Sequence, residues 1–190
     1  GVGSGAGFDI THGDNNTCLG QGAGNTGNPG GAITTASNRI ALGDDAVTHI
    51  YAQVSSITGA SDARDKTDFT PLDLGLDFVK ALAPVTYKWD KRSKYGDKTA
   101  EGYDLTAQTP DGTHKEDWLD VGFTAQAVEA LENAAGYSTD TNTNLIYDIN
   151  PDGKSMGLQY TKFIPILVKA IQEQNALIEA LTARITTLEG

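Results

Sequence analysis

The sequence lacks several features that would place it in a common functional class. Its one cysteine, Cys18, excludes an internal disulfide or a zinc site built from several cysteines. No run of eighteen apolar residues is present, and the first residues lack the basic and apolar regions of a secretory signal. Lys and Arg number 14 against 25 Asp and Glu, which argues against unspecific binding to nucleic acid. We expect a soluble, folded protein with neither a nucleic-acid nor a membrane partner.

Glycine and charge are distributed unevenly along the chain. Residues 1–60 hold 13 of the 22 glycines, four acidic residues and one basic residue, Arg39. Residues 61–190 hold the other 21 acidic and 13 basic residues. This change of composition predicts a domain boundary between residues 60 and 61.

The first part contains an imperfect repeat. Residues 16–23 (NTCLGQGA) and 39–46 (RIALGDDA) align with Leu-Gly in register at an offset of 23. Such repeats are typical of stacked β units that cannot bury an apolar face alone. Alternating residues at 46–54 predict a further strand. We expect short strands and Gly/Asn turns that need neighbours, either from a longer upstream chain or from identical chains.

After residue 69 the pattern is typical of mixed α/β structure, and the expected fold class is α+β. Leu74, Phe78 and Leu82 recur every fourth residue, which predicts a short helix within residues 71–84, stopped by Pro84. Strands are predicted within residues 85–89 and 117–123, a helix at 124–136 with Thr124 as N-cap and Gly136 as stop, and a hairpin around a turn at residues 150–153.

The last thirty residues carry a heptad repeat. Its a and d positions are Ile164, Leu167, Ile171, Gln174, Ile178, Leu181, Ile185 and Leu188. This narrow apolar seam favours a coiled-coil helix at about residues 161–189 over a helix packed on its own domain. Ile at a with Leu at d favours two strands, while a polar d residue such as Gln174 can fix register, so the heptads alone leave dimer and trimer open.

Residues 59–69 (GASDARDKTDF) lie where the two parts meet and place Ser61 and Lys66 five residues apart. One interpretation of this small, polar segment is a solvated linker. The other is a cleavage site.

Four blocks of the second part resemble, in the same order, the C-terminal intramolecular chaperone domain of bacteriophage tail spikes and fibres, the peptidase S74 family. They are SDARDKTDF at residues 61–69, PLDLGLDFVKALAPVTYKWD at 71–90, DVGFTAQAVEALE at 120–132 and YTKFIPILVKAIQEQNALIEAL at 160–181. The resemblance covers residues 61–190 almost entirely, with the coiled coil at the end. Residues 1–60 look like the end of a trimeric, β-structured fibre or spike stem. Ala127 stands where relatives often have glutamate, and this departure affects no catalytic role.

The resemblance implies a homotrimer that brings three chains into register so that an interwoven β stem can form. It further implies that the domain then releases itself by cutting the bond between Ala60 and Ser61. On this interpretation Ser61 is the nucleophile and Lys66 its base, while Asp62 and Arg64 shape the loop. The protein would be a virion tail fibre or spike precursor made in the host cytoplasm, with the chaperone part released after cleavage.

The chemistry of these residues is consistent with that implication. A lysine takes a proton from a serine hydroxyl only when its amine is neutral, which requires burial or nearby cations such as Arg64. Because Ser61 directly follows the carbonyl of Ala60, its oxygen is placed to attack that carbonyl and give an ester that water resolves. Gly59 leaves room for this approach and tolerates unusual backbone angles.

Other motifs carry weaker signals. Residues 140–151 begin like a calcium loop but lack its glycine and its final glutamate, and residues 1–7 and 96–99 lack the rest of a phosphate-binding loop. The three histidines, His12, His49 and His114, are scattered, and Trp89 and Trp118 are expected in the core. No metal and no other cofactor is expected. The alternative function is a non-cleaving structural trimerisation module or receptor-binding tip of a viral fibre.

Overall fold

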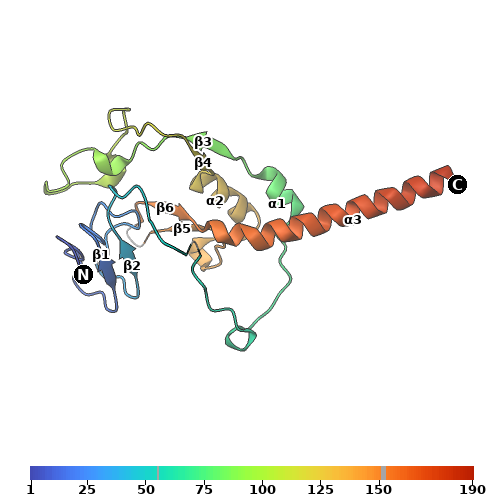
Figure 1. Ribbon diagram of the computed structural model, residues 1–190, viewed down its shortest axis with the longest axis horizontal. Helices are drawn as coiled ribbons and strands as arrows, with labels where there is room; N and C mark the ends of the chain where they lie inside the picture. The colour runs from blue at the N-terminus through green and yellow to red at the C-terminus, as the bar shows by residue number, and fades with distance from the viewer. Residues whose placement is uncertain (55, 151–152) are drawn as a thin grey trace. The chain divides into compact units, whose positions relative to one another are not determined.

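The computed structural model describes residues 1–54, 56–150 and 153–190 (Figure 1). The chain divides into two compact units, each made from segments that are distant in the sequence. Unit 1 comprises Gly1–Thr48 and Ala83–Gln159, and unit 2 comprises His49–Leu82 and Tyr160–Gly190. The architecture is mixed α/β with small two-stranded sheets and a long C-terminal helix. The compositional boundary between residues 60 and 61 lies inside unit 2 and stays a prediction.

Unit 1 begins with the two repeats, which stack in register. β1 (Thr17–Leu19) pairs in parallel with β2 (Ile40–Leu42), and Cys18 lies opposite Ala41, at an offset of 23. Further hydrogen bonds span the same offset, among them Thr11 Oγ1 to the Thr34 carbonyl, the Asp14 N–H to Ser37 Oγ, and Asn15 Nδ2 to Asn38 Oδ1. The predicted stacking of β units is confirmed.

The backbone conformation of the two repeats recurs together with these hydrogen bonds. Asn15 and Asn38 have φ angles of 55° and 62°, and Gly20 and Gly43 have φ angles of 103° and 69°. These left-handed angles are open to glycine and, at small cost, to asparagine. The stack therefore requires the glycines of the Leu-Gly pairs that mark the repeat in the sequence, and it places asparagine at a second matching position. Its small core buries Cys18, Ala23, Ile33 and Ala41.

Residues 46–54 form no strand, so the prediction from their alternating pattern is wrong for the single chain. They run as a loop in which Ile50, Tyr51 and Val54 are 75%, 90% and 69% exposed. A strand needs a neighbour that satisfies its backbone donors and acceptors. Among the described residues, no strand pairs with this segment.

The second segment of unit 1 contributes an antiparallel pair of short strands. β3 (Val85–Tyr87) pairs with β4 (Asp120–Gly122), at the two places where strands were predicted. Trp89 and Trp118 lie beyond the strand ends and are 43% and 45% exposed, so their predicted place in the core is wrong. The indole of Trp89 instead donates a hydrogen bond to Asp120 Oδ2 at 3.1 Å, which satisfies its N–H near the surface.

The predicted second helix and hairpin are both present. α2 (Ala125–Ala134) begins after Thr124, whose side chain makes no capping hydrogen bond, and is followed by Gly136 with a φ of 90°. β5 (Tyr147–Ile149) and β6 (Met156–Leu158) form the antiparallel hairpin. Of its predicted turn at residues 150–153, residues 151 and 152 lie outside the described residues. The Gly153 N–H donates to the Asn150 carbonyl at 2.7 Å.

A buried carboxylate ties α2 to β5. Glu132 has no exposed surface. Its Oε2 accepts the N–H of Leu145 at 2.6 Å, and its Oε1 accepts those of Ile146 at 2.8 Å and Tyr147 at 3.2 Å. Burying a carboxylate is costly unless donors replace its water. The three backbone donors do so and fix the chain where β5 begins.

Unit 2 contains the short helix α1 (Leu76–Ala81) and the long helix α3 (Phe163–Glu189). The predicted helix within residues 71–84 is confirmed but shorter than its apolar spacing indicates. Glu173 of α3 accepts the backbone N–H of Leu76 at 2.7 Å. A Cβ at Gly75 would overlap the carboxylate of Glu173, so a larger residue there would displace this side chain.

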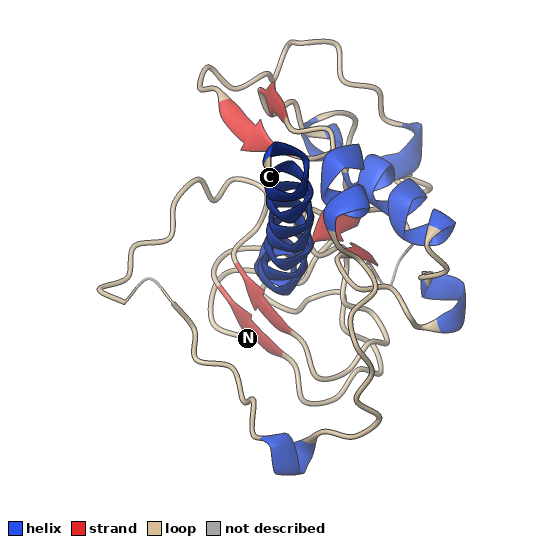
Figure 2. Cartoon of the chain, turned by 90° about the vertical axis from the view of Figure 1, so that its right-hand side faces the viewer, coloured by secondary structure: helices blue, strands red, loops and turns tan. Residues whose placement is uncertain are grey.

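The helix predicted over the heptads is confirmed as α3, which Figure 2 shows nearly end-on. Its 27 residues span roughly 40 Å at 1.5 Å per residue. Pro165 lies in the first turn, where its missing N–H costs no intrahelical bond. No helix among residues 1–54, 56–150 and 153–190 is long and apolar enough to cross a membrane.

We expect Glu132→Gln to lower the free energy of unfolding by about 2–3 kcal/mol, because an amide group would face backbone donors with a donor of its own. Chemical denaturation of the full chain measures this loss. Glu129→Gln, at a half-buried position three residues earlier on the same helix, is the control and should change stability by less than about 0.5 kcal/mol. Equal losses for the two variants would contradict the anchoring role.

Candidate active site

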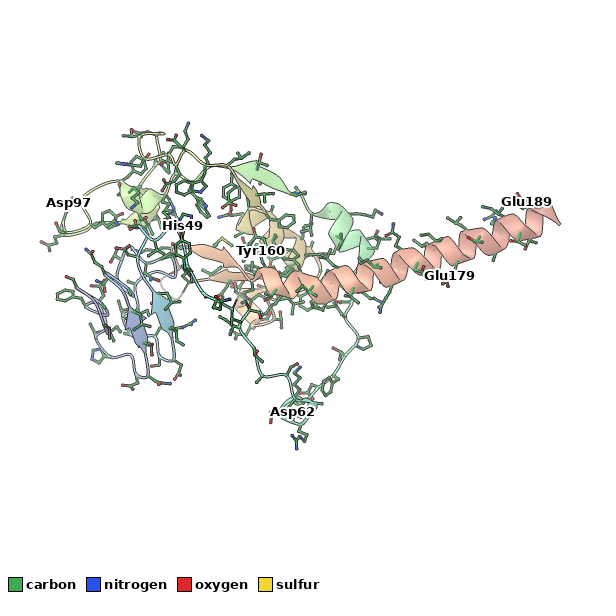
Figure 3. All side chains as sticks on the ribbon, in the orientation of Figure 1. His49, Asp62, Asp97, Tyr160, Glu179 and Glu189 are labelled. Carbon is green, nitrogen blue, oxygen red and sulfur yellow. The ribbon has the colours of Figure 1, made fainter. Side chains whose placement is uncertain are left out.

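The candidate site lies on the loop that leads to α1. Its only regular element is a single 3₁₀ turn, Ala63–Asp65, in a segment where every residue from 56 to 71 is exposed. Figure 3 labels Asp62 at this turn. Asp62 caps the turn by accepting the N–H of Arg64 on Oδ1 at 2.9 Å. The turn reverses the chain and brings residue 66 back toward residue 61.

Ser61 and Lys66 are in direct contact. Lys66 Nζ donates a hydrogen bond to Ser61 Oγ at 2.7 Å. A serine and a base within about 2.6–3.2 Å have the spacing required for proton transfer. Both side chains are exposed. The pair therefore has the geometry of a nucleophile and its base, but water surrounds it in the single chain.

Arg64 is held by Asp62 on the same turn. Its Nη2 lies 2.6 Å from Asp62 Oδ2, and its Nε lies 3.1 Å and 3.2 Å from the two carboxylate oxygens. The side-chain hydrogen bonds from Arg64, and then the bond from its backbone N–H, hold the pKa of Asp62 below its ordinary value. Asp62 in turn raises the pKa of Arg64. The positive charge of Arg64 is therefore balanced by Asp62. This leaves burial, and not a nearby cation, as the factor that would favour a neutral amine at residue 66.

The residues directly before Ser61, from 56 to 60, belong to no helix or strand. Gly59 is not among the glycines with a positive φ, and a Cβ at this position would meet nothing within 4 Å. The space around Gly59 is therefore open, as expected, while its backbone makes no use of the left-handed angles that glycine tolerates. Ala60 is exposed, so its carbonyl is open to approach.

The heptad seam of α3 is uncovered in the single chain. Its apolar a and d side chains are 43–79% exposed, and Gln174 is exposed as well. The residues of α3 that are buried, Phe163, Ile166 and Ala170, occupy other heptad positions in the first two turns. The seam is thus free along the whole helix, while a different face near its start is used within the chain.

Residues 61–137 match the model of the family described as chaperone of endosialidase, Peptidase_S74. This segment belongs to the peptidase S74 family. Searches of curated proteins and of solved structures gave no match. The matched segment of the S74 family begins at Ser61 and includes the Ser-Lys turn, α1, β3, β4 and α2. Membership supports a chaperone role for the segment, and the resemblance of residues 138–190 stays a prediction.

The other candidates from the sequence do not come together in the structure. The ring of His49 stacks on Tyr51, and the ring of His114 meets Tyr95 edge-on at 4.9 Å. Residues 139–141 form a 3₁₀ turn that ends at Asn142, which has a φ of 54°. Within the described parts of the chain, no group of three His, Cys, Asp or Glu side chains could hold a metal ion.

One polar cluster went unpredicted. Asp45 is only 7% exposed and lies against three lysines of residues 91–98. These residues are about fifty positions apart in the sequence, and no motif or periodicity joins them. The only available signal was the doubled Asp44-Asp45 in the second repeat, where the first repeat has Gln21-Gly22.

We expect Arg64→Ala to raise the pKa of the Asp62 carboxyl toward the ordinary value of about 3.9. The rise should be incomplete, because the backbone N–H of residue 64 remains as a donor. A carbon-detected NMR titration of the Asp62 carboxyl in a Ser61→Ala chain measures it. Arg92→Ala, which removes a half-buried guanidinium that donates to the Lys154 carbonyl, should leave this pKa unchanged. Identical titrations with and without Arg64 would rule out the pairing.

Proposed function

We propose that this protein is an intramolecular chaperone that trimerises and registers a phage tail fibre or spike, and then releases itself by autoproteolysis between Ala60 and Ser61. The observation that carries the proposal is the 2.7 Å contact between Lys66 Nζ and Ser61 Oγ, at the first residues of the S74 match. Residues 1–60 are the end of the fibre stem, and residues 61–190 are the chaperone domain. The chain is part of a tail fibre or spike precursor, and the chaperone domain is released from this precursor after cleavage.

The proposed reaction needs no cofactor. The neutral amine of Lys66 takes the proton of Ser61 Oγ, and this oxygen attacks the carbonyl carbon of Ala60. The bond from that carbon to Ser61 N breaks, the nitrogen takes up a proton, and residues 1–60 remain attached as an ester on Ser61 Oγ. Water then hydrolyses the ester, which leaves a carboxylate on Ala60 and restores the serine hydroxyl.

Trimerisation supplies the condition that the single chain lacks. A lysine reaches its neutral form near pH 7 only when burial or neighbouring charge disfavours the ammonium. In the single chain residues 56–71 are all exposed, so packing against other chains has to remove water from the pair. The uncovered a and d side chains of α3 favour such an assembly with identical helices. Cleavage would then report that the assembly has formed.

A second function, a permanent trimerisation module or receptor-binding tip, is favoured by a different observation. The Ser61–Lys66 pair is fully solvated, and the charge of Arg64 is balanced by Asp62. In that case the contact between serine and lysine is incidental, and the bond between residues 60 and 61 persists in the folded oligomer.

We expect the freshly expressed chain to yield fragments of residues 1–60 and 61–190, with a new N-terminus at Ser61. Ser61→Ala and Lys66→Ala should stay whole, because each removes one partner of the proton transfer. A denaturing gel with intact mass measurement distinguishes these outcomes. Ser56→Ala and Lys80→Ala are matched controls at other exposed positions and should still be cut. A wild-type chain that stays whole as a folded oligomer would favour the permanent module.

We expect Ile171→Asp combined with Ile178→Asp to give monomers, because two charges would enter the seam of α3. The double variant should be cut at least about tenfold more slowly. Without burial of Lys66 its pKa would stay at least about one unit higher, and one unit lowers the neutral fraction tenfold. Light scattering after gel filtration gives the mass, and gel time courses give the rate. Ala180→Asp with Ala183→Asp places the same residues outside the seam and should remain oligomeric. A monomer that cuts at the wild-type rate would disprove the coupling.

A further inference from the structure

Unit 1 contains chain from both sides of the proposed cut. Its first segment, Gly1–Thr48, precedes the bond between residues 60 and 61, and its second segment, Ala83–Gln159, follows it. Cutting the loop therefore removes a covalent connection but leaves every contact inside unit 1 in place. What holds the two fragments together, and under which conditions they part, depends on the contacts between these two segments.

The most buried charge in those contacts is Asp45. Lys98 Nζ lies 3.0 Å from its Oδ2, and Lys94 Nζ lies 3.8 Å from its Oδ1. Lys91 Nζ donates to its backbone carbonyl at 2.8 Å. Asp45 is 7% exposed, while the side chains of Lys94 and Lys98 are 30% and 33% exposed. One carboxylate thus receives lysines from a single short stretch, residues 91–98, which we call the lysine loop.

The residues around Asp45 accommodate the lysine loop in space and in charge. A Cβ at Gly27 would come within 2.9 Å of Lys98 Nζ, so glycine gives the lysine room beside the repeats. Burial alone would raise the pKa of Asp45, but hydrogen bonds from Ser93 and Lys98 and the charges of Lys98 and Lys94 lower it below the ordinary value. The carboxylate is therefore ionised at neutral pH and balanced by the loop.

Comparison of the two repeats indicates that the carboxylate of Asp45 is needed for contact with the lysine loop and not for stacking of the repeats. Gly22 occupies the position of Asp45 in the first repeat, 23 residues earlier. The first repeat stacks without a carboxylate at this place. The charge is present only in the repeat that meets residues 91–98. A second contact nearby, from Asn150 Nδ2 to the Pro29 carbonyl at 3.1 Å, joins the same two segments without charge.

We propose that Asp45 and the lysine loop form a charge-dependent lock that holds residues 1–60 to residues 61–190 after the chain is cut. The inference rests on the proposed function for the cut itself, while the lock is present in the intact chain. Removing one partner of a buried ion pair is strongly destabilising, because the other charge is left without compensation. The lock makes release a separate step from cleavage. Processed fragments stay paired until this cluster is opened.

The experiment makes the cut independently of the dyad. A recognition sequence for a specific endoprotease is inserted between Ile57 and Thr58, in the exposed loop, in a full chain that carries Ser61→Ala. After digestion, gel filtration with intact mass follows the pairing of the fragments, and dilution gives its Kd. Self-cleavage has no part in this assay, so failure of the proposed function and failure of the lock are distinguishable.

We expect the fragments to stay paired after digestion. Asp45→Asn should raise the Kd at least tenfold, and Lys94→Met with Lys98→Met should do the same without altering the repeats. The Asp45 and lysine changes combined should cost less than the product of their separate effects, because they remove the same interaction. In 1 M NaCl the Kd of the unsubstituted pair should rise more than that of the Asp45→Asn pair.

The matched control is Asp44→Asn, which removes a charge at the adjacent residue, where Oδ1 accepts the N–H of Ala46 and an amide oxygen can still do so. Its Kd should change less than twofold. Equal effects of the Asp44 and Asp45 changes would overturn the lock. Separation of the unsubstituted fragments on cutting would overturn it as well. If Asp45→Asn unfolds the uncut chain, the double lysine variant decides, and an unchanged Kd there overturns the proposal.

Discussion

The single chain cannot bury its own heptad seam, and this constraint governs the rest of the molecule. The first two turns of α3 bury Phe163, Ile166 and Ala170, which occupy other heptad positions. The a and d side chains remain 43–79% exposed along the helix. Apolar surface arranged at this period is stabilised by an identical helix beside it. The polar loop at residues 56–71 is likewise exposed in the single chain, and the proposed cleavage requires that water be removed from it.

Because of how the chain is divided into units, cleavage of the bond between residues 60 and 61 and separation of the two fragments are different events. The bond between residues 60 and 61 lies in a loop of unit 2, whereas the contacts between the flanking segments lie in unit 1. Breaking a bond in an exposed loop changes chain connectivity and leaves packed contacts unchanged. A charged contact such as that of Asp45 is suited to a tie that must later open, because its strength depends on salt and on competing charge in a way that apolar burial does not. Asn150, which binds the carbonyl of Pro29 without charge, gives a weaker and salt-independent component.

Periodic features of the fold could be predicted from the sequence, because each rests on local chemistry. The 23-residue offset appears in the sequence as Leu-Gly at matching positions, and the left-handed angles of Gly20 and Gly43 explain the glycine there. The heptads predicted α3, and the five-residue spacing of Ser61 and Lys66 suits a single 3₁₀ turn capped by Asp62.

Features that depend on distant partners could not be predicted. The alternation at residues 46–54 satisfied the rule for a strand, but the described part of the chain provides no neighbouring strand for it. The indole of Trp89 lies near the surface because Asp120 accepts its N–H there. In the sequence, Glu132 on α2 looks like any helical glutamate. Its burial is explained by three backbone N–H donors, which lie just before β5 and at its first residue. Asp45 and its lysines are a similar case, because long-range charge pairing leaves no periodic signal.

The geometry of the dyad and its protonation impose different requirements, and only the first is met by one chain. An ordinary lysine has a pKa of about 10.4, so roughly one amine in 2,500 is neutral at pH 7. In the hydrogen bond between residues 66 and 61 the amine is the donor, whereas a base must accept the serine proton. Burial can shift a lysine by up to about 3–5 pKa units, which is enough to reverse this direction. A pair that is already 2.7 Å apart needs no rearrangement for that change, only the removal of water. In the proposed mechanism the local turn therefore fixes the reacting atoms, and the proton transfer requires the contacts between chains that remove water from them.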